Sequence, residues 1–230
     1  MADFTGETAK LTYFHGWGLA EQLRWVLAAT NTPFDNVCLD THAQMQELRA
    51  EGRLLFGQLP LLEIDGLQLT QSQAMVRYVA ARGGISGATP AEVVLVDMVA
   101  EGARDARGIV VGTPFAPNRA EHLAKLPVHL DKYLPKFEAI LAKAASGGVL
   151  ASGALTYADV LLGELLEGLE GLQPGCTAAA TFPLLAALRA KIRALPGVVA
   201  YLASDKRYPF PAEGAATDAY VKNVNTVLGR

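Results

Sequence analysis

The sequence predicts a small α/β domain followed by a larger, all-helical domain. Strand-like and helix-like patterns alternate over residues 8–84, whereas the pattern from residue 91 onward is helical. The stretch between them, GGISGATP, is rich in glycine and ends in proline, which is typical of a linker. With 230 residues the chain is long enough for two modest domains. We therefore expect an α/β domain at 8–84 and a helical domain at 90–230.

The first domain begins with a strand, a helix and a second strand. The segment 10–14 is short and rich in residues that favour strands. Apolar residues at helical spacing follow it within residues 19–30. Residues 34–39 predict the second strand, because they follow the breaker Pro33 and are rich in strand formers. A weaker helical signal comes after this strand.

The second half of this domain predicts a hairpin and a helix. Two apolar runs at residues 59–64 and 67–70 are joined by Asp65-Gly66, a dipeptide typical of a two-residue hairpin turn. The next helix is expected to take Ser72 as its N-cap and to stop at Gly83-Gly84.

The sequence of the second domain predicts successive helices that are separated by proline and glycine residues. Thr156 and Asp159 have the spacing of a capping box. Glu164, Glu167 and Glu170 recur at every third position, which we interpret as a solvated helix face and not as a ligand cluster. The expected helices are 93–110, 128–145, 157–170, 182–195, 197–204 and 218–229.

Composition and charge argue against several classes of protein. Hydrophobic residues make up 51% and charged residues 19%, which is typical of a globular chain. A net charge of −3 without a basic run argues against nucleic acid as a partner. The longest uncharged stretch, residues 171–188, contains two prolines and predicts no membrane span. Cys38 and Cys176 are too few for a disulfide framework or a four-thiolate zinc site, so we expect a cytoplasmic protein without a metal.

Four segments carry a family resemblance, in the order KLTYF, FGQLPLLEIDG, LTQSQAMVRYVA and SGALTYAD. They resemble the cytosolic glutathione S-transferases with a catalytic tyrosine, of alpha, mu, pi or sigma type, over essentially the whole chain. The resemblance implies the glutathione transferase fold, a thioredoxin-like domain followed by an all-α domain, in a homodimer. It also implies an enzyme that conjugates glutathione to hydrophobic electrophiles, with glutathione peroxidase activity as a possible addition. Glutathione would be a cosubstrate, with no tightly bound cofactor.

The resemblance places the catalytic hydroxyl at Tyr13, at the end of the first strand. A free thiol with a pKa of about 8.5 is only ~3% thiolate at pH 7. Lowering that pKa by about two makes the thiol mostly thiolate and needs roughly 2.7 kcal/mol of preference for the anion. A hydrogen bond to a charged group contributes about 1.5–3 kcal/mol, so one tyrosine hydroxyl would supply most of this preference.

The resemblance also implies which residues hold glutathione. Leu59 and Pro60 would be joined by a cis bond that turns the Leu59 backbone toward the cysteinyl moiety. Gln71 and Ser72 would hold the γ-glutamyl group at a helix N-terminus. Arg49 would pair with the glycyl carboxylate. The full expected set is Phe14, Arg49, Gln58, Leu59, Pro60, Gln71, Ser72 and Asp105 of the partner subunit.

A dimer contact and a second pocket are further implications of the resemblance. Phe56 would insert as a key between helices of the partner's helical domain, and a fully buried phenylalanine contributes about 1.5–3 kcal/mol. The electrophile would bind among Phe14, Trp17, Val110, Phe115 and Tyr220.

Two positions depart from the pattern of these relatives. Trp17 and Leu19 stand where several relatives carry an arginine. In one class of these relatives, the arginine at the second position lies near the thiolate. Tyr13 must therefore work without a cation from this turn. The glycyl carboxylate also has a second candidate partner in Arg53, and the sequence leaves this choice open.

Other functions stay open at this point. A glutathione-dependent isomerase, as among sigma-type relatives, would use the same thiolate. A non-catalytic member would keep the fold as a binding or structural protein. A thiol–disulfide mechanism of omega type is disfavoured, because Cys38 falls in the second predicted strand and Cys176 in the helical domain.

Overall fold

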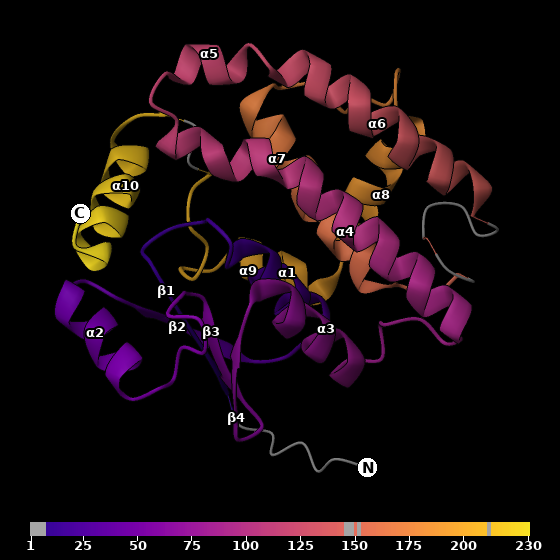
Figure 1. The fold of residues 1–230 in the computed structure, drawn as a ribbon. Helices are drawn as coiled ribbons and strands as arrows, with labels where there is room; N and C mark the ends of the chain where they lie inside the picture. The colour runs from indigo at the N-terminus through magenta and orange to yellow at the C-terminus, as the bar shows by residue number, and fades with distance from the viewer. Residues whose placement is uncertain (1–7, 145–149, 151–152, 211–212) are drawn as a thin grey trace.

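The computed structural model of the chain describes residues 8–144, 150, 153–210 and 213–230. A small sheet with three helices comes first, and a group of helices follows it (Figure 1). The two parts therefore follow each other in the predicted order. Ala145, the last residue of one predicted helix, lies outside the described residues.

One mixed sheet of four strands forms the centre of the first part, in the order β2-β1-β3-β4. β1 runs parallel to β2 and antiparallel to β3, which forms a hairpin with β4. The predicted hairpin is confirmed, since Asp65 and Gly66 have φ values of 51° and 74°, as a primed two-residue turn requires. The strands are β1 (Ala9–Tyr13), β2 (Phe34–Cys38), β3 (Leu61–Ile64) and β4 (Leu67–Thr70).

Three helices belong to the sheet, and the rest form the helical part. The first three are α1 (Glu21–Ala29), α2 (His42–Ala50) and α3 (Ser72–Arg82). The others are α4 (Pro90–Gly112), the 3-10 turn η1 (Thr113–Phe115), α5 (Arg119–Leu123), α6 (Leu126–Lys143), α7 (Tyr157–Leu172), α8 (Pro183–Arg193), α9 (Pro196–Leu202) and α10 (Ala215–Leu228).

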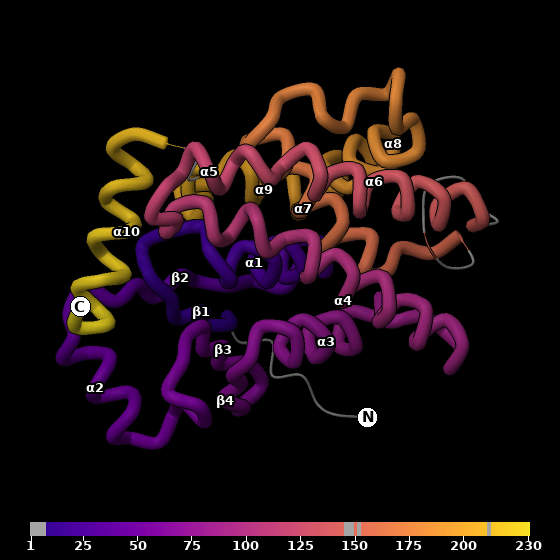
Figure 2. The backbone as a smooth tube through the Cα atoms, turned by 45° about the horizontal axis from the view of Figure 1, so that its top comes forward, coloured from indigo at the N-terminus to yellow at the C-terminus, as the bar shows by residue number. Residues whose placement is uncertain are grey.

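Helix α1 joins the two parts. It packs against α3 on the side of the sheet and against α7 and α9 of the helical part, and nearly all its residues are buried. Helix α7 is equally buried and packs against α4, α8 and α1. The chain returns to the first part at its end, because α10 packs against α2 (Figures 1 and 2). Across the described residues, no helix is both long and apolar enough to span a bilayer.

Capping boxes start the two central helices of the helical part. At α7, the Thr156 hydroxyl accepts from the Asp159 amide, and the Asp159 carboxylate accepts from the Thr156 amide at 2.8 Å. The predicted capping box is therefore confirmed. Helix α4 starts in the same way with Thr89 and Glu92, and Pro90 occupies its first turn, where no amide hydrogen is needed.

The predicted role of Ser72 as an N-cap is wrong. Ser72 is the first residue of α3, and the cap position belongs to Gln71, which has a φ of 69° and a ψ of 106°. A hydroxyl caps a helix only from a residue with extended backbone just outside it. The unusual backbone of Gln71 moves the helix start by one residue, and nothing in the local sequence signals it.

The interpretation of the three α7 glutamates as a solvated face is also wrong. Glu164 is fully buried and pairs with Arg107. Glu167 pairs with two arginines of α8, and Glu170 accepts from the amides of Gly175 and Thr177. Helix α7 is covered on every side, so its acidic residues meet partners and not water.

Candidate active site

Tyr13 is the last residue of β1, and its side chain is buried. Its backbone is fixed by pairing with Cys38 of β2 and by the amide of Leu39, which donates to its carbonyl. The Leu19 amide donates to the Tyr13 hydroxyl at 3.0 Å. Gly18 permits this close approach, because its φ is 38° and a Cβ there would lie 2.5 Å from the hydroxyl oxygen.

A second tyrosine, Tyr220 of α10, reaches the Tyr13 hydroxyl. The hydroxyls of Tyr220 and Tyr13 lie together beside Gly18, where an added Cβ would be 2.3 Å from the Tyr220 oxygen, and the Tyr220 ring lies against Gly16. Phe115 packs edge-on against the Tyr220 ring, with 5.5 Å between the ring centres. Burial raises the pKa of Tyr13, so its hydroxyl keeps its proton at neutral pH. Tyr13 therefore accepts a hydrogen bond from the Leu19 amide and retains its own hydrogen.

The segment predicted to hold the cysteinyl moiety precedes β3. The Leu59-Pro60 bond is cis, as predicted. The Gln71 side-chain amide donates to the Gln58 carbonyl oxygen at 3.3 Å, which links this segment to the start of α3. Four of the predicted glutathione-binding residues are thus adjacent.

The two candidate arginines for the glycyl carboxylate differ in their contacts. Arg49 donates from Nε and Nη2 to the Gly57 carbonyl, at 3.2 and 3.0 Å. Arg53 instead pairs with Glu63 at 2.7 Å and with Glu51 at 3.5 Å. Arg49 therefore lies against the cis segment, and Arg53 is held by two carboxylates.

A cavity of about 670 Å³ lies between the start of α3 and helix α4. Gln71 and Ser72 line it, together with Leu19, whose amide holds the Tyr13 hydroxyl. The cavity thus extends from the predicted γ-glutamyl site to Leu19, the neighbour of the predicted catalytic residue Tyr13. Its lining is Leu19, Gln22, Gln71, Ser72, Gln73, Glu101, Arg104, Arg107, Gly108, Val111 and Gly112.

Arg107 brings a buried positive charge from α4 to this cavity. Its Nε and Nη2 each donate to the Glu164 carboxylate at 2.8 Å, and Nη2 also donates to the Gly18 carbonyl at 2.8 Å. The guanidinium lies over the Trp17 ring, 4.3 Å from its centre. Burial acts to lower the pKa of Arg107, but the Glu164 carboxylate outweighs burial and raises it. The guanidinium therefore stays charged.

Comparison with known proteins identifies the family. Residues 9–81 match the model of the glutathione S-transferase N-terminal domain, and residues 112–205 match that of the C-terminal domain. The chain is 37% identical to glutathione S-transferase alpha-4 of Rattus norvegicus, over 95% of this chain and 97% of that protein. It is 38% identical to glutathione S-transferase alpha I of Oryctolagus cuniculus, over 84% of this chain and 86% of that protein. The solved Pi-class glutathione S-transferase of Onchocerca volvulus superposes with a TM-score of 0.78 at 28% identity, over 90% and 98% of the two chains.

The chain belongs to the glutathione S-transferase family. This confirms the predicted fold, with a small mixed sheet in the N-terminal domain and a helical C-terminal domain. It also confirms the predicted enzyme class and its reaction, the conjugation of glutathione. The alpha-type relatives match over nearly the full length, and alpha is one of the four types that the sequence resembles.

The predicted electrophile pocket of this transferase is only partly assembled. Phe115 and Tyr220 touch, and Tyr220 and Trp17 line a smaller cavity of about 100 Å³. Phe14 packs edge-on against Tyr13, with 4.9 Å between the ring centres. Val110 is fully buried against the core, and its neighbour Val111 lines the large cavity.

The two residues predicted at the dimer interface are exposed in the single chain. Phe56 is 63% exposed, and the side chain of Asp105 is 64% exposed, 3.9 Å from Arg104. Neither lines the large cavity as the described residues form it.

Sequence reasoning missed the buried charges beside the site. Arg107 lies on the same stripe of α4 as Val96, Ala100, Ala103 and Val110, all of which are buried. A charge at helical spacing within an apolar stripe is the signal that would have found it. The partner Glu164 interrupts the apolar run of α7 in the same way.

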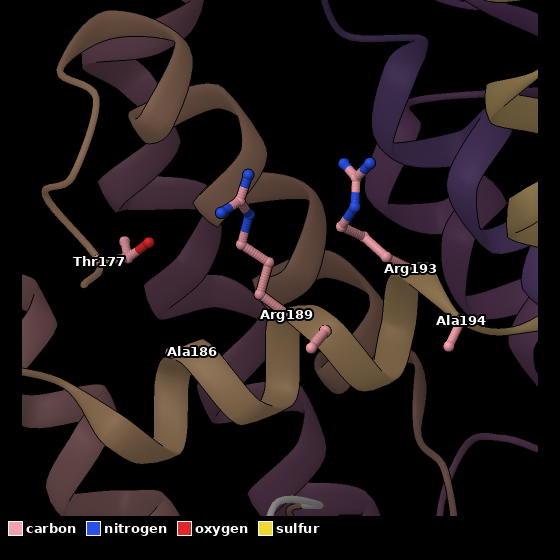
Figure 3. A pocket seen from close by; sticks show the side chains of 6 residues that line it. Thr177, Ala186, Arg189, Arg193 and Ala194 are labelled. Carbon is pink, nitrogen blue, oxygen red and sulfur yellow. The ribbon is translucent and has the colours of Figure 1, made fainter. Parts of the chain in front are cut away.

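A second large cavity of this transferase, of about 610 Å³, lies beside α8 (Figure 3). Arg189 and Arg193 project from α8 toward the same side, and both pair with Glu167 of α7 at 2.6 Å. No predicted site residue lines it in the described part of the chain. These arginines hold two helices together.

Proposed function

We propose that Tyr13 is the catalytic residue, and that its hydroxyl donates a hydrogen bond to the thiolate of glutathione. One observation carries the proposal: the Tyr13 oxygen accepts from the Leu19 amide, so its own hydrogen is left for an acceptor. The raised pKa supports this direction, because a protonated phenol donates and a phenolate does not. A donor aimed at developing negative charge favours the thiolate over the thiol.

Glutathione would lie from the cis segment to the large cavity. The Leu59 backbone would pair with the cysteinyl moiety as an added strand, since it lies just before β3 and beside Gln71 through Gln58. Gln71 and Ser72 at the start of α3 would hold the γ-glutamyl carboxylate, where free amides and the helix dipole favour an anion. Arg49 would take the glycyl carboxylate with its Nη1, because its other donors hold the Gly57 carbonyl. Phe14 would pack against the bound peptide beside Tyr13.

The electrophile would enter the same cavity from the side of α4 and α10. Phe14, Trp17, Val110, Phe115 and Tyr220 remain the proposed apolar surroundings, with Val111 added as a lining residue. Aryl halides, enals and organic hydroperoxides are suitable electrophiles, the last of these through a peroxidase reaction. An isomerase that uses the same thiolate is the second candidate; one neighbour, at 26% identity, is described as a prostaglandin synthase D of Nilaparvata lugens.

We also propose a homodimer with Phe56 as a key and Asp105 of the partner subunit facing the γ-glutamyl amino group. The exposure of Phe56 supports a partner contact, as does that of neighbouring Leu55. Helix α4 exposes further apolar side chains at Val94 and Met98. A neighbour at 28% identity, Na-GST-3 of Necator americanus, is described as monomeric, so the dimer needs its own test.

The remaining proposals concern the organisation of the protein. The domains would divide at residues 83–90, between the end of α3 and the start of α4. No cofactor besides glutathione would be needed. Two unpaired cysteines support a reducing, cytoplasmic location.

The test of Tyr13 is its replacement by phenylalanine. Tyr13→Phe should lower kcat for chlorodinitrobenzene conjugation roughly ten- to a hundred-fold, because a charge-assisted hydrogen bond of about 1.5–3 kcal/mol is lost. The affinity for glutathione, measured by calorimetry, should change little, since the peptide arms hold the ligand. Tyr133→Phe is the matched control, because Tyr133 lies in α6 away from the cavity. Full activity of Tyr13→Phe would show that another group activates the thiol.

A further inference from the structure

We propose that Arg107 of the helical domain is the cation that supports the glutathione thiolate. The inference rests on the proposed role of Tyr13 and extends it to a positioning residue on α4. The turn that leads from Tyr13 to α1, residues 14–20, contains neither arginine nor lysine. His15 of this turn pairs with Asp40 at 2.9 Å, so an arginine that adds to the effect of Tyr13 must come from outside the turn.

Two buried guanidiniums act on the Tyr13 hydroxyl, those of Arg107 and Arg24. Arg24 is directed to the other side of the turn. It donates to the Gly16 carbonyl at 3.0 Å and to Asn36 of β2 at 3.0 Å, and it lies over the Tyr208 ring. Arg107 lines the large cavity itself. Of the two, Arg107 is the one that a ligand in the cavity meets.

The contacts of Arg107 leave one donor unused. Nε and Nη2 are engaged by Glu164 and by the Gly18 carbonyl. Nη1 is shielded from solvent and has no hydrogen-bond partner among the described residues. A solvent-shielded atom does not reach a ligand directly, so Arg107 acts through its charge and not through a contact. Because Arg107 lines the large cavity, this charge lies beside the proposed thiolate site.

Arg107 also fixes the turn that holds Tyr13. Its bond to the Gly18 carbonyl anchors the residue before Leu19, whose amide donates to the Tyr13 hydroxyl. Glu164 holds the guanidinium from the far side, and Glu21 is the other carboxylate whose charge acts on it. Because Glu164 balances the charge of Arg107, the pair is tolerated in the core, and the guanidinium contacts the Gly18 carbonyl on its other side.

The experiment compares variants of the full-length transferase by the thiol pKa of bound glutathione. That pKa is read from the ultraviolet absorbance of the thiolate in a pH titration of the binary complex. Arg107→Gln should raise it by about one, so the thiolate fraction at pH 7 falls roughly threefold if the bound thiol starts mostly ionised. The kcat should fall by a similar factor at neutral pH and recover at high pH, with the KM for glutathione nearly unchanged. Arg107→Lys should keep most of the effect, because it keeps the charge.

Two further variants separate this inference from a structural role. Arg107→Met with Glu164→Leu removes the pair without leaving a buried carboxylate unpaired, so it protects the fold. It should raise the thiol pKa as Arg107→Gln does. Arg189→Met is the matched control, because Arg189 pairs with Glu167 one turn further along α7 and lines the other cavity. It should leave the thiol pKa unchanged.

The outcomes distinguish this inference from the proposed function. If Tyr13→Phe raises the thiol pKa and the Arg107 variants do not, the inference about Arg107 is overturned and the role of Tyr13 stands. Equal effects of Arg107→Lys and Arg107→Gln would also overturn it, because the charge would then not be the cause. If neither Tyr13→Phe nor the Arg107 variants move the thiol pKa, both proposals are wrong.

Discussion

Two tyrosine hydroxyls from opposite ends of the chain meet in the site, and only one of them reaches the substrate in our proposal. The two hydroxyls lie side by side at Gly18, and in this proposal Tyr220 donates to Tyr13, which keeps its own hydrogen for the thiolate. A hydroxyl that accepts hydrogen bonds becomes a stronger donor, since linked hydrogen bonds polarise one another. Tyr220 therefore acts through Tyr13 as a positioning residue.

Tyr220→Phe tests this chain of hydrogen bonds. Removing one neutral hydrogen bond of about 0.5–1.5 kcal/mol should lower kcat/KM roughly two- to tenfold at neutral pH. The phenyl ring preserves the packing on Gly16 and Phe115. Tyr208→Phe is the control, because it removes a hydroxyl of the same C-terminal segment whose partner is Cys38. Activity equal to that of the control would show that the bond between the two tyrosines has no catalytic effect.

Among single residues, the sequence predicts the position of those that belong to a short motif. Tyr13, the cis Leu59-Pro60 bond and the contact of Gln58 with Gln71 follow from short motifs. Arg107 and Glu164 belong to no motif, and single charges on helices usually face water. Their pairing depends on how α4 and α7 pack, which is a tertiary property.

Among the elements, the start of α3 departs most from what its sequence predicts. Its cap position is occupied by Gln71 in a backbone conformation with positive φ, which costs a residue other than glycine about 1–3 kcal/mol. Such strain persists where the surrounding structure imposes it, and it is common at ligand sites. Here it places Gln71 beside Gln58 and at the wall of the large cavity.

A pair of substitutions at Gln71 separates this strain from the side-chain contacts. Gln71→Gly and Gln71→Ala both remove the side chain, but only alanine keeps the unfavourable φ. The glycine variant should therefore be more stable than the alanine variant by about 1 kcal/mol in urea unfolding. Both should weaken glutathione binding to a similar extent, because both lose the amide. Equal stability of the two variants would show that the backbone here is unstrained.

Other elements were predictable because their signals are local. The Asp65-Gly66 hairpin and the capping box of Thr156 and Asp159 each depend on residues within four positions of one another. The ion-paired glutamates of α7 were not predictable, because a glutamate on a solvated face and one facing an arginine look alike in sequence.

For the whole molecule, the two-part division was visible in the change from alternating to purely helical patterns. The sequence does not predict how the two parts are arranged, because α1 and α10 connect them through contacts between segments far apart in the chain. The same limit applies to assembly. Exposed apolar side chains at residues 55, 56, 94 and 98 appear only once the fold is known, and they raise the question of what covers them.

Replacing Phe56 by serine tests the proposed dimer and the shared site together. Burial of a phenylalanine contributes about 1.5–3 kcal/mol, and a twofold dimer uses it twice, so Phe56→Ser should weaken dimerisation roughly 100- to 10,000-fold. Sedimentation should show a shift from dimer to monomer at micromolar concentration. Activity should fall with it, because Asp105 of the partner subunit would leave the γ-glutamyl end. Val199→Ser, at another half-exposed apolar residue on α9, should change neither property. A monomeric wild type, or a monomeric Phe56→Ser with full activity, would rule out a site built from two chains.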